Sequence, residues 1–262
     1  MLACTESKPY SDNKGNSVSG DFVLNNSRIY FGGQNNHVHL NNVIINNCTI
    51  FLRNSNSCLY IEKNQISNIY QFIISEDCNC IIREGITNGR ILIRVGEGNL
   101  IIGRDCMLSQ NIYIQNHDGH PIYDIESGEL QNPGKSIIIG DHVWVGESVS
   151  IMKGSNIGSG SVVGSKAFLS NNMYPNNSVI VGIPAKDIKS NIFWKRLGLH
   201  VVSRDKRESM TIDHSKNFQY QHDSLVPYQY LDSELLKISD PRVRINFIKS
   251  FLIKNELNKR EL

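Results

Sequence analysis

No charge of one sign dominates this chain. Its 27 Lys and Arg residues nearly balance its 25 Asp and Glu residues, and the formal net charge is +2. Binding to nucleic acid usually needs a clear basic excess, so we expect no nucleic-acid partner, although an acidic partner could meet a local basic patch. The chain also lacks an apolar run of about 18 residues, so the sequence predicts no integral membrane segment.

The sequence has few features of a secreted or metal-binding protein. Its first residues, MLACTESKPYS, do not combine a basic region with an apolar stretch as a signal peptide does. Six cysteines are present, but none forms a CxxC pair or has the spacing of a zinc site. We interpret the cysteines as small buried side chains in a reducing compartment. The sequence therefore predicts a cytoplasmic protein with no metal site.

A six-residue repeat is the strongest feature that is present. Aliphatic residues recur at every sixth position: Ile139, Val145, Ile151, Ile157, Val163 and Leu169. A small or β-branched residue stands four positions after each of the first five, and glycine directly follows four of the six. Neither a hairpin sheet nor an α-helix of period 3.6 gives this pattern. It predicts a triangular coil in which three units close one turn and the aliphatic side chains point inward.

The register of this repeat slips once. The same period occurs upstream at Ile102, Leu108 and Ile114, but the next repeat residue, Ile139, stands 25 positions after Ile114. That step is one residue longer than four repeat units, so a segment of about 116–136 is inserted between two coils. The insert is polar and rich in turn residues, and loops of this length in compact domains are usually functional.

We therefore predict an all-β solenoid, a parallel β-helix of hexapeptide repeats with a long inserted loop and a short helical C-terminal extension. Residues 1–20 are expected to form a tail, residues 21–189 the β-helix, and residues 190–262 the extension. Asn-rich runs before residue 100 are interpreted as irregular coils, because Asn tolerates left-handed corners. The run NIFWKRLGL predicts a short helix capping the coil, and 233–258 predicts helices with a break near Asp240–Pro241.

The segment from Gly119 to Lys189 resembles the hexapeptide-repeat acyltransferases. The resemblance depends on GHPI at 119–122, IGDHVWVGESVSI at 139–151, IGSGSVVGSKAFL at 157–169 and VGIPAKDI at 181–188. It covers about a quarter of the chain closely. The long insert and the extension are more similar to bacterial capsular polysaccharide O-acetyltransferases, in particular those of the meningococcal type that act on sialic acid capsules. The resemblance implies a left-handed β-helix, a homotrimer with active sites between subunits, and acetyl-CoA as the donor.

The resemblance also implies the catalytic residues. Transfer of an acetyl group to a sugar hydroxyl needs a base, because a hydroxyl is a poor nucleophile near pH 7. His120 stands at the family's Gly-His-Pro position and is implied to be that base, with His117 as its main rival. Asp118, Glu126 or a backbone carbonyl is a candidate to orient the His120 ring. Trp144 matches the family's Trp beside the thioester and the pantetheine arm.

Nine residues match positions where the family meets CoA: Trp144, Gly146, Ser165, Lys166, Ser170, Gly182, Pro184, Lys186 and Lys189. The charge of the three lysines suits the phosphates of CoA. The sequence contains no GxxxxGK[ST] and no GxGxxG motif, so CoA is favoured over a nucleoside triphosphate or a dinucleotide. Glu147 departs from the small polar residue of several relatives, and its carboxylate would repel a phosphate.

The resemblance further implies an acidic polysaccharide as the acceptor. Such a polymer carries a carboxylate on each sialic acid, and Arg83, Arg90, Arg94 and Lys135 are candidates to meet it. Alternatives remain: an acetyltransferase for another sugar or aminosugar, a metal-dependent hydratase like the γ-class carbonic anhydrases, or a non-catalytic glycan-binding β-helix. The hydratase would need three His ligands, for which His117, His120 and His142 are available.

Overall fold

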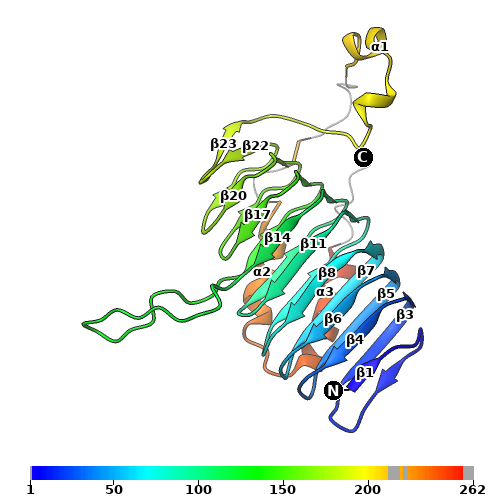
Figure 1. Cartoon of the computed structure of the whole chain (residues 1–262), viewed down its shortest axis with the longest axis vertical. Helices are drawn as coiled ribbons and strands as arrows, with labels where there is room; N and C mark the ends of the chain where they lie inside the picture. The colour runs from blue at the N-terminus through cyan, green and yellow to red at the C-terminus, as the bar shows by residue number, and fades with distance from the viewer. Residues whose placement is uncertain (1, 212–218, 221–223, 256–262) are drawn as a thin grey trace.

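The computed structural model of the chain describes residues 2–211, 219–220 and 224–255. Three sheets form the sides of one tapering prism, and the chain visits sheet B, then C, then A in each complete turn (Figure 1). Sheet A contains β1 Leu2–Cys4, β4 Arg28–Phe31, β6 Thr49–Leu52, β8 Ile69–Ile74, β11 Ile91–Val95, β14 Ile112–Gln115, β17 Ser150–Met152 and β20 Phe168–Leu169. Sheet B contains β2 Tyr10–Ser11, β3 Ser17–Asn25, β5 His37–Asn46, β7 Cys58–Ser67, β9 Asn79–Ile82, β12 Asn99–Ile102, β15 Ile137–Ile139, β18 Asn156–Ile157 and β21 Met173–Tyr174. Sheet C contains β10 Thr87–Asn88, β13 Met107–Leu108, β16 Trp144–Val145, β19 Val162–Val163, β22 Val179–Gly182 and β23 Ala185–Lys189.

The predicted repeat residues form the interior of this prism. Ile139 pairs with Ile157 in sheet B, Val145 with Val163 in sheet C, and Ile151 with Leu169 in sheet A, all as parallel neighbours. All six repeat residues belong to the buried core, with at most 1% of their surface exposed. The glycines that follow repeat residues lie where successive coils approach each other closely. A Cβ on Gly146 would stand 2.7 Å from the backbone nitrogen of Ser165, so stacking of the coils leaves no room for a side chain.

Asparagine forms most of the corners. Ten of the sixteen non-glycine residues with positive φ in the described chain are Asn, as expected for a coil that turns often. In the early coils one long strand covers two sides of the prism and bends at a single residue. Asn42 is such a residue in β5, with a φ of 56°, and Lys63 takes the matching place in β7. Coils are also joined by side-chain ladders, such as Asn25 to Asn46 at 2.9 Å.

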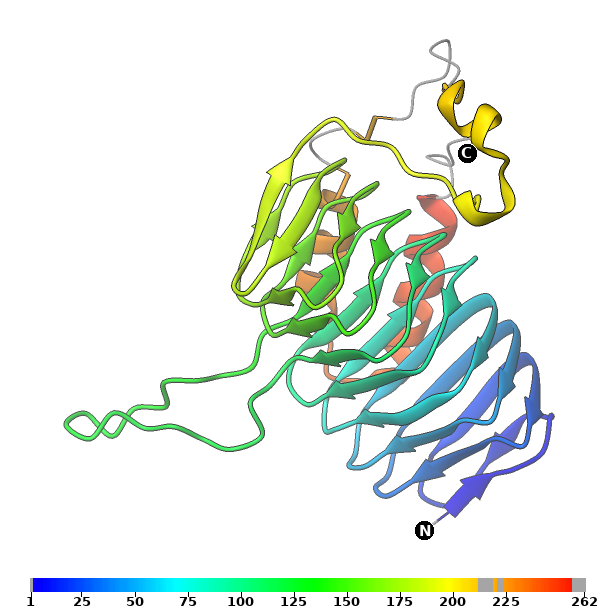
Figure 2. The ribbon, with the colours of Figure 1, turned by 45° about the horizontal axis from the view of Figure 1, so that its top comes forward.

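The N-terminal segment is ordered into the solenoid, which differs from the expected tail. β1 pairs antiparallel with β4, and β2 pairs antiparallel with β3, so both close the first coil (Figure 2). These pairings satisfy backbone groups that the first parallel strands would otherwise leave open. Cys4 lies in the core with the other hydrophobic residues, and all six cysteines are free and buried.

Helices cover the outer face of sheet B. The extension contains the 3-10 turn η1 Leu199–Val201 and the helices α1 Arg204–Glu208, α2 Val226–Leu235 and α3 Pro241–Lys254. Asp240 caps α3 by accepting from the backbone nitrogens of Arg242 and Val243, which explains the predicted break before Pro241. Leu231, Leu235 and Ile248 pack on an outward row of sheet B formed by Cys58, Tyr60, Ile81, Ile101 and Ile138.

The run NIFWKRLGL is not helical before Leu199, the first residue of η1, contrary to the expectation, because its aromatic side chains pack along the coil instead. Residues 256–258 of the other predicted helical segment lie outside the described residues. In the described part of the chain, no helix has the length and apolar character needed to cross a membrane.

Candidate functional site

The insert leaves the prism at the corner between sheets A and B, because it joins β14 to β15. It projects far from the coils as an extended loop (Figures 1 and 2). Its root is fixed by the Asp118 carboxylate, which accepts from Lys153 Nζ at 2.6 Å and from Asn132 Nδ2 at 2.9 Å. The hydrogen bond from Lys153, supported by that from Asn132, lowers the pKa of Asp118. The two arms of the loop are thereby tied to each other and to the next coil.

His120 lies beyond this root, and its side chain is exposed. Asn132 Nδ2 donates to the His120 backbone oxygen at 2.9 Å, which positions the backbone rather than the ring. Within the described chain, the His120 ring has no hydrogen-bond partner, and the candidate Asp118 is bound to Lys153 and Asn132 instead. The ring is therefore free to meet a substrate or a second protein chain.

His117 differs from His120 in its surroundings. Its ring packs directly on Gly96, where any larger residue would collide with it. Burial lowers the pKa of His117, and the charges of Arg94 and Arg53 act in the same direction against Glu97 and Asp118. The ring therefore fills space at the root of the loop. This packing distinguishes it from the freely exposed ring of His120.

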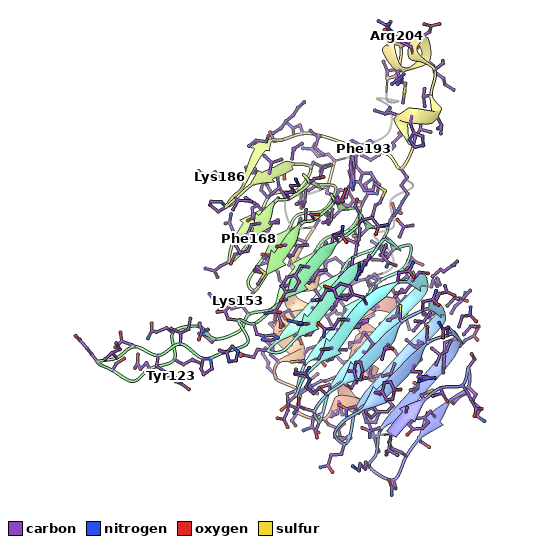
Figure 3. The ribbon with its side chains drawn as sticks, viewed as in Figure 1. Tyr123, Lys153, Phe168, Lys186, Phe193 and Arg204 are labelled. Atoms are coloured by element: carbon purple, nitrogen blue, oxygen red, sulfur yellow. The ribbon has the colours of Figure 1, made fainter. Side chains whose placement is uncertain are left out.

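The loop exposes several large apolar side chains. Ile125 at its tip is 99% exposed, and others follow along both arms: Ile122, Tyr123 and Leu130. Figure 3 shows Tyr123 on the projecting arm, well away from the coils. Apolar groups gathered on a projecting loop are typical of a surface that packs against another chain.

Trp144 occupies a different side of the prism, the outer face of sheet C. It is 38% exposed and stands in a row with Met107, Val162, Val179 and Lys189, which are neighbours across successive strands. Three strand spacings separate Trp144 from Lys189, or about 14 Å. This row is an open apolar track with a cation at one end.

A segment that was not predicted to matter lies beside Trp144. Residues 190–198 return along the corner between sheets B and C, and the Trp194 ring lies 6.0 Å from the Trp144 ring. Trp194 Nε1 donates to the His142 backbone oxygen at 2.9 Å, and the His142 ring stacks on Trp194 at 4.0 Å. The paired aromatic residues and the sharp turn at His142 were the available signals in the sequence.

Asp105 and Arg196 fasten this segment to the coil. Arg196 Nε donates to Asp105 Oδ1 at 2.9 Å, and His142 Nδ1 lies 2.6 Å from Asp105 Oδ2. Burial opposes the charge of this carboxylate, but the hydrogen bond from His142 and the charge of Arg196 prevail and lower the pKa of Asp105. The second tryptophan is thus held rigidly next to Trp144.

The other predicted CoA residues lie at three places on the prism. Gly146, Ser165 and Lys166 lie at the corner between sheets C and A, where Lys166 N donates to the Glu147 backbone oxygen at 2.8 Å. Glu147 is exposed at the same corner, so it is well placed to affect a bound phosphate. Ser170 follows β20 and lies instead at the corner between sheets A and B, on the side of the inserted loop.

The turn between β22 and β23 holds the remaining residues. Gly182 pairs with Ala185, and Pro184 lies in the tight turn between them. Lys186 and Lys189 are exposed on β23, the last strand of sheet C, and Figure 3 shows Lys186 at that outer edge. Together with Trp144, these lysines form one continuous surface of the chain.

One chain does not bring His120 and Trp144 together. In a triangular prism, the corner between sheets A and B is opposite sheet C. The loop that carries His120 projects away from that corner and away from sheet C. His142 is buried at a third position, with both ring nitrogens engaged by Asp105 and the Trp194 backbone oxygen. The hydratase alternative requires three histidines that converge on one metal ion. His117, His120 and His142 do not converge within the described chain.

The four residues predicted to contact the acceptor polysaccharide also lie at separate places on the chain. Arg83 is 2% exposed beneath the helices and pairs with Glu62 at 2.7 Å, so it does not line an open path. Arg90 stacks over Tyr70, and Arg94 Nε donates to Gln71 at 2.8 Å, both on the outer face of sheet A. Lys135 Nζ donates to Asn171 at 2.7 Å, near the root of the loop.

Comparisons with known proteins agree with the fold. No family model matches the chain. It is 37% identical over 191 residues to a polysialic acid O-acetyltransferase of Neisseria meningitidis, covering 72% of this chain and 89% of that protein. A polysialic acid O-acetyltransferase of Escherichia coli O1:K1 is 46% identical over 110 residues, which span 42% of this chain and 36% of that protein.

Two solved structures are also similar. The polysialic acid-specific acetyltransferase NeuO gives a TM-score of 0.56 at 34% identity, covering 71% of this chain and 91% of that one. The polysialic acid O-acetyltransferase OatWY gives 0.58 at 36% identity, covering 73% and 96%. The protein is a left-handed β-helix acetyltransferase of the hexapeptide-repeat class. Within that class, the chain belongs to the polysialic acid O-acetyltransferase family.

Proposed function

We propose that this protein transfers the acetyl group of acetyl-CoA to a hydroxyl of polysialic acid, at a site formed between two subunits of a homotrimer. The observation that carries the proposal is the separation of His120 from Trp144 on opposite sides of one prism. A threefold arrangement brings a corner of one subunit against a side of the next. The apolar side chains along the projecting loop supply the contact surface. The free, buried cysteines suit the bacterial cytoplasm, where we place the reaction.

In this proposal His120 is the general base. Its ring takes the proton from the sugar hydroxyl as the oxygen attacks the thioester carbonyl carbon, and the sulfur leaves with the electrons of the broken bond. The proton then passes to the departing thiolate, so the base is regenerated. The His120 ring is exposed and has no hydrogen-bond partner within the described chain, so a group of the adjacent subunit orients it.

The residues on sheet C suit the shape and charge of the donor. When bound, acetyl-CoA supplies the activated acetyl group. Trp144 and the apolar row beside it would hold the pantetheine arm, while Lys186 and Lys189 would meet phosphates at the far end of the track. Gly146, Ser165 and Lys166 lie together at the corner between sheets C and A, beside this track. These residues bind and orient the donor, and His120 moves the proton.

A subunit-mixing experiment tests the site directly. His120→Ala and Trp144→Ala proteins are each expected to lose most transfer to polysialic acid from labelled acetyl-CoA. If the two residues come from different chains, equal mixing restores roughly a quarter of wild-type activity, because random assembly rebuilds that share of intact sites. No recovery after verified subunit exchange would overturn the shared site. Sedimentation at micromolar concentration should give the mass of a trimer.

The base assignment has its own control. Removing a general base lowers the rate by about 10²–10⁴-fold, so His120→Ala should lose activity on that scale while CoA binding is kept. His200→Ala removes another histidine, in η1, and should leave turnover unchanged. Wild-type turnover by the His120→Ala protein would contradict the assignment.

A further inference from the structure

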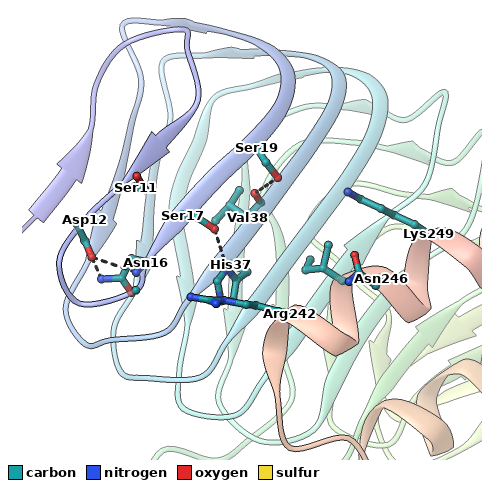
Figure 4. Close-up of a pocket in the computed structure, with 12 residues that line it drawn as sticks. Ser11, Asp12, Asn16, Ser17, Ser19, His37, Val38, Arg242, Asn246 and Lys249 are labelled. Carbon is teal, nitrogen blue, oxygen red and sulfur yellow. Dashed lines mark hydrogen bonds between the residues drawn. The ribbon is translucent and has the colours of Figure 1, made fainter.

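A cavity lies far from the loop and from Trp144, between the outer face of the first coils and helix α3. Its volume is about 350 Å³. Figure 4 shows residues of β3 and β5 on one wall and residues of α3 on the other. The cavity is open to one side and polar groups line both walls. No step of the proposed transfer reaction uses it.

The cavity exists because the outer face of sheet B changes character at the first coils. In the later coils this face presents Tyr60, Ile81 and Ile101, and the helices pack tightly on it. In β3 and β5 the same outward rows present Ser17 and Ser19, then His37 and His39. Small hydroxyls and imidazoles leave a space under α3 that the apolar residues fill elsewhere.

Helix α3 lines this space with cations. Arg242, Asn246 and Lys249 are spaced by four and three residues, so they share one face of the helix. They line the cavity together, as Figure 4 shows. In the described chain, neither Arg242 nor Lys249 forms an ion pair with a carboxylate. Asp12, on the opposite rim, accepts from Asn16 and from the Lys14 backbone nitrogen. Asp240, beside Arg242, caps the helix.

Both cations stand at positions that disfavour a positive charge. Arg242 is the second residue of α3, where the positive end of the helix dipole opposes it. Burial lowers the pKa of Lys249, and in turn the charge of Lys249 adds to burial in lowering the pKa of His39 to about 4. Packing of the helix does not need these charges, because Ile245 and Ile248 supply its apolar contacts. Charged side chains at positions where burial or the helix dipole disfavours their charge are typical of binding sites.

Hydrogen bonds link the polar side chains on the two walls of the cavity. Arg242 Nε donates to His37 Nε2 at 3.3 Å, and the same ring nitrogen lies 3.2 Å from Asn35 Oδ1. The other ring nitrogen, His37 Nδ1, lies 2.6 Å from Ser17 Oγ. Ser19 and His39 repeat this pair at 3.0 Å. Hydroxyl and amide groups beside two separated cations suit a sugar acid, whereas the described lining of the cavity contains no Phe, Tyr or Trp ring on which a nucleotide base could stack.

We propose that this cavity binds a segment of the acidic polysaccharide acceptor, with Arg242 and Lys249 each meeting a carboxylate of the polymer. Seven residues of helix separate the two cations, or about 10 Å along the axis, which suits successive charges on an extended chain. The inference rests on the proposed acceptor. A polymer held here as well as at the transfer site stays attached between reactions, which raises its effective concentration for long chains only.

The test compares long and short acceptors. The double variant Arg242→Gln, Lys249→Gln should raise KM for long polysialic acid about 5- to 10-fold, while kcat/KM for a sialic acid trimer is unchanged. The matched control, Lys237→Gln with Lys254→Gln, removes two exposed lysines nearby and should change neither value. Equal loss with both acceptors, or no change with the long one, would overturn the proposal.

Direct binding separates this site from the transfer reaction. Labelled polysialic acid is titrated into the His120→Ala protein with and without the cavity substitutions. Weaker binding in the cavity variant supports the site even if no transfer to polysialic acid is ever observed, and equal binding contradicts it. Inorganic phosphate serves as a competitor. Displacement of the polymer by phosphate at matched charge would reduce the site to a general anion site and overturn its assignment to a sugar acid.

Discussion

The outer faces of sheets B and C show how one repeat can serve two purposes. Both sheets are built from the same inward aliphatic rows, so their inner faces are alike. On sheet B the outward row is apolar, with Tyr60, Ile81 and Ile138, and the C-terminal helices bury it. On sheet C the outward row keeps Trp144 and Lys189 accessible. The inner row therefore determines the solenoid, and the outer row determines what binds to it.

The largest expected effect concerns stability on sheet B. Leu231 of α2 is fully buried in the cluster that joins the helices to this face. Leu231→Ala should lower the free energy of unfolding by about 3 kcal/mol, because it leaves a cavity at the interface. Transfer activity per folded molecule should be nearly unchanged. Denaturant unfolding with parallel activity measurements checks this, and a stability loss below 1 kcal/mol would show that the helices are loosely held.

Trp144→Ala should give the opposite result on sheet C. Because the side chain is partly exposed, its loss should change the free energy of unfolding little. We expect kcat/KM for acetyl-CoA to fall about 10- to 100-fold, which corresponds to about 1.4–2.7 kcal/mol of lost transition-state binding. Trp144→Phe should recover part of this loss. A destabilised protein with normal kinetics would mean that Trp144 is a packing residue.

Lys189→Ala should have a smaller effect at the end of the same row. The KM for acetyl-CoA is expected to rise about 3- to 5-fold, since one exposed charge is removed from a phosphate. The difference between wild type and variant should shrink as salt is added, because screening weakens the wild-type contact. The exposed Lys195 is the matched control. An effect that does not depend on salt would argue against a phosphate contact.

The smallest expected effect is the pH dependence at the polar end of sheet B. Burial, with the charge of Lys249, lowers the pKa of His39 to about 4. An unfolded chain would bind a proton near pH 6.5, so the folded state resists protonation between these values, and its stability should fall as pH drops from about 6.5 to about 4. His39→Gln should remove roughly 0.5 kcal/mol of this dependence, because the side chain is only partly buried and solvent screens its charge. Unfolding measured across that range checks the sign.

Much of the fold was predictable because hexapeptide periodicity is a local property. Each aliphatic residue from Ile139 to Leu169 must point inward once the six-residue unit is accepted, and the slip after Ile114 located the insert. The two strands before residue 20 were missed because antiparallel closure of the first coil depends on contacts with β3 and β4. The residues of the site were predicted because they match positions of the family. Their arrangement in space was not predicted.

The helices show where local reasoning ends. Continuous apolar runs at 80–82, 100–102 and 137–139 are typical of strands buried on both faces, but they do not say what covers the outer face. Residues more than a hundred positions later do so here. Arg83 was misread for the same reason, because it is buried close to Tyr228 of α2, in that distant segment.

The sequence alone determined the repeat, the inward rows, the position of the insert and the residues that match the family. These follow from spacing along the chain, which the six-residue unit translates directly into direction. Only the tertiary structure decided that His120 and Trp144 stand on opposite sides of the prism, that Trp194 supports Trp144, and that α3 leaves a basic cavity over the first coils. Such relations depend on which coil sides face each other in space, and no spacing in the sequence encodes them.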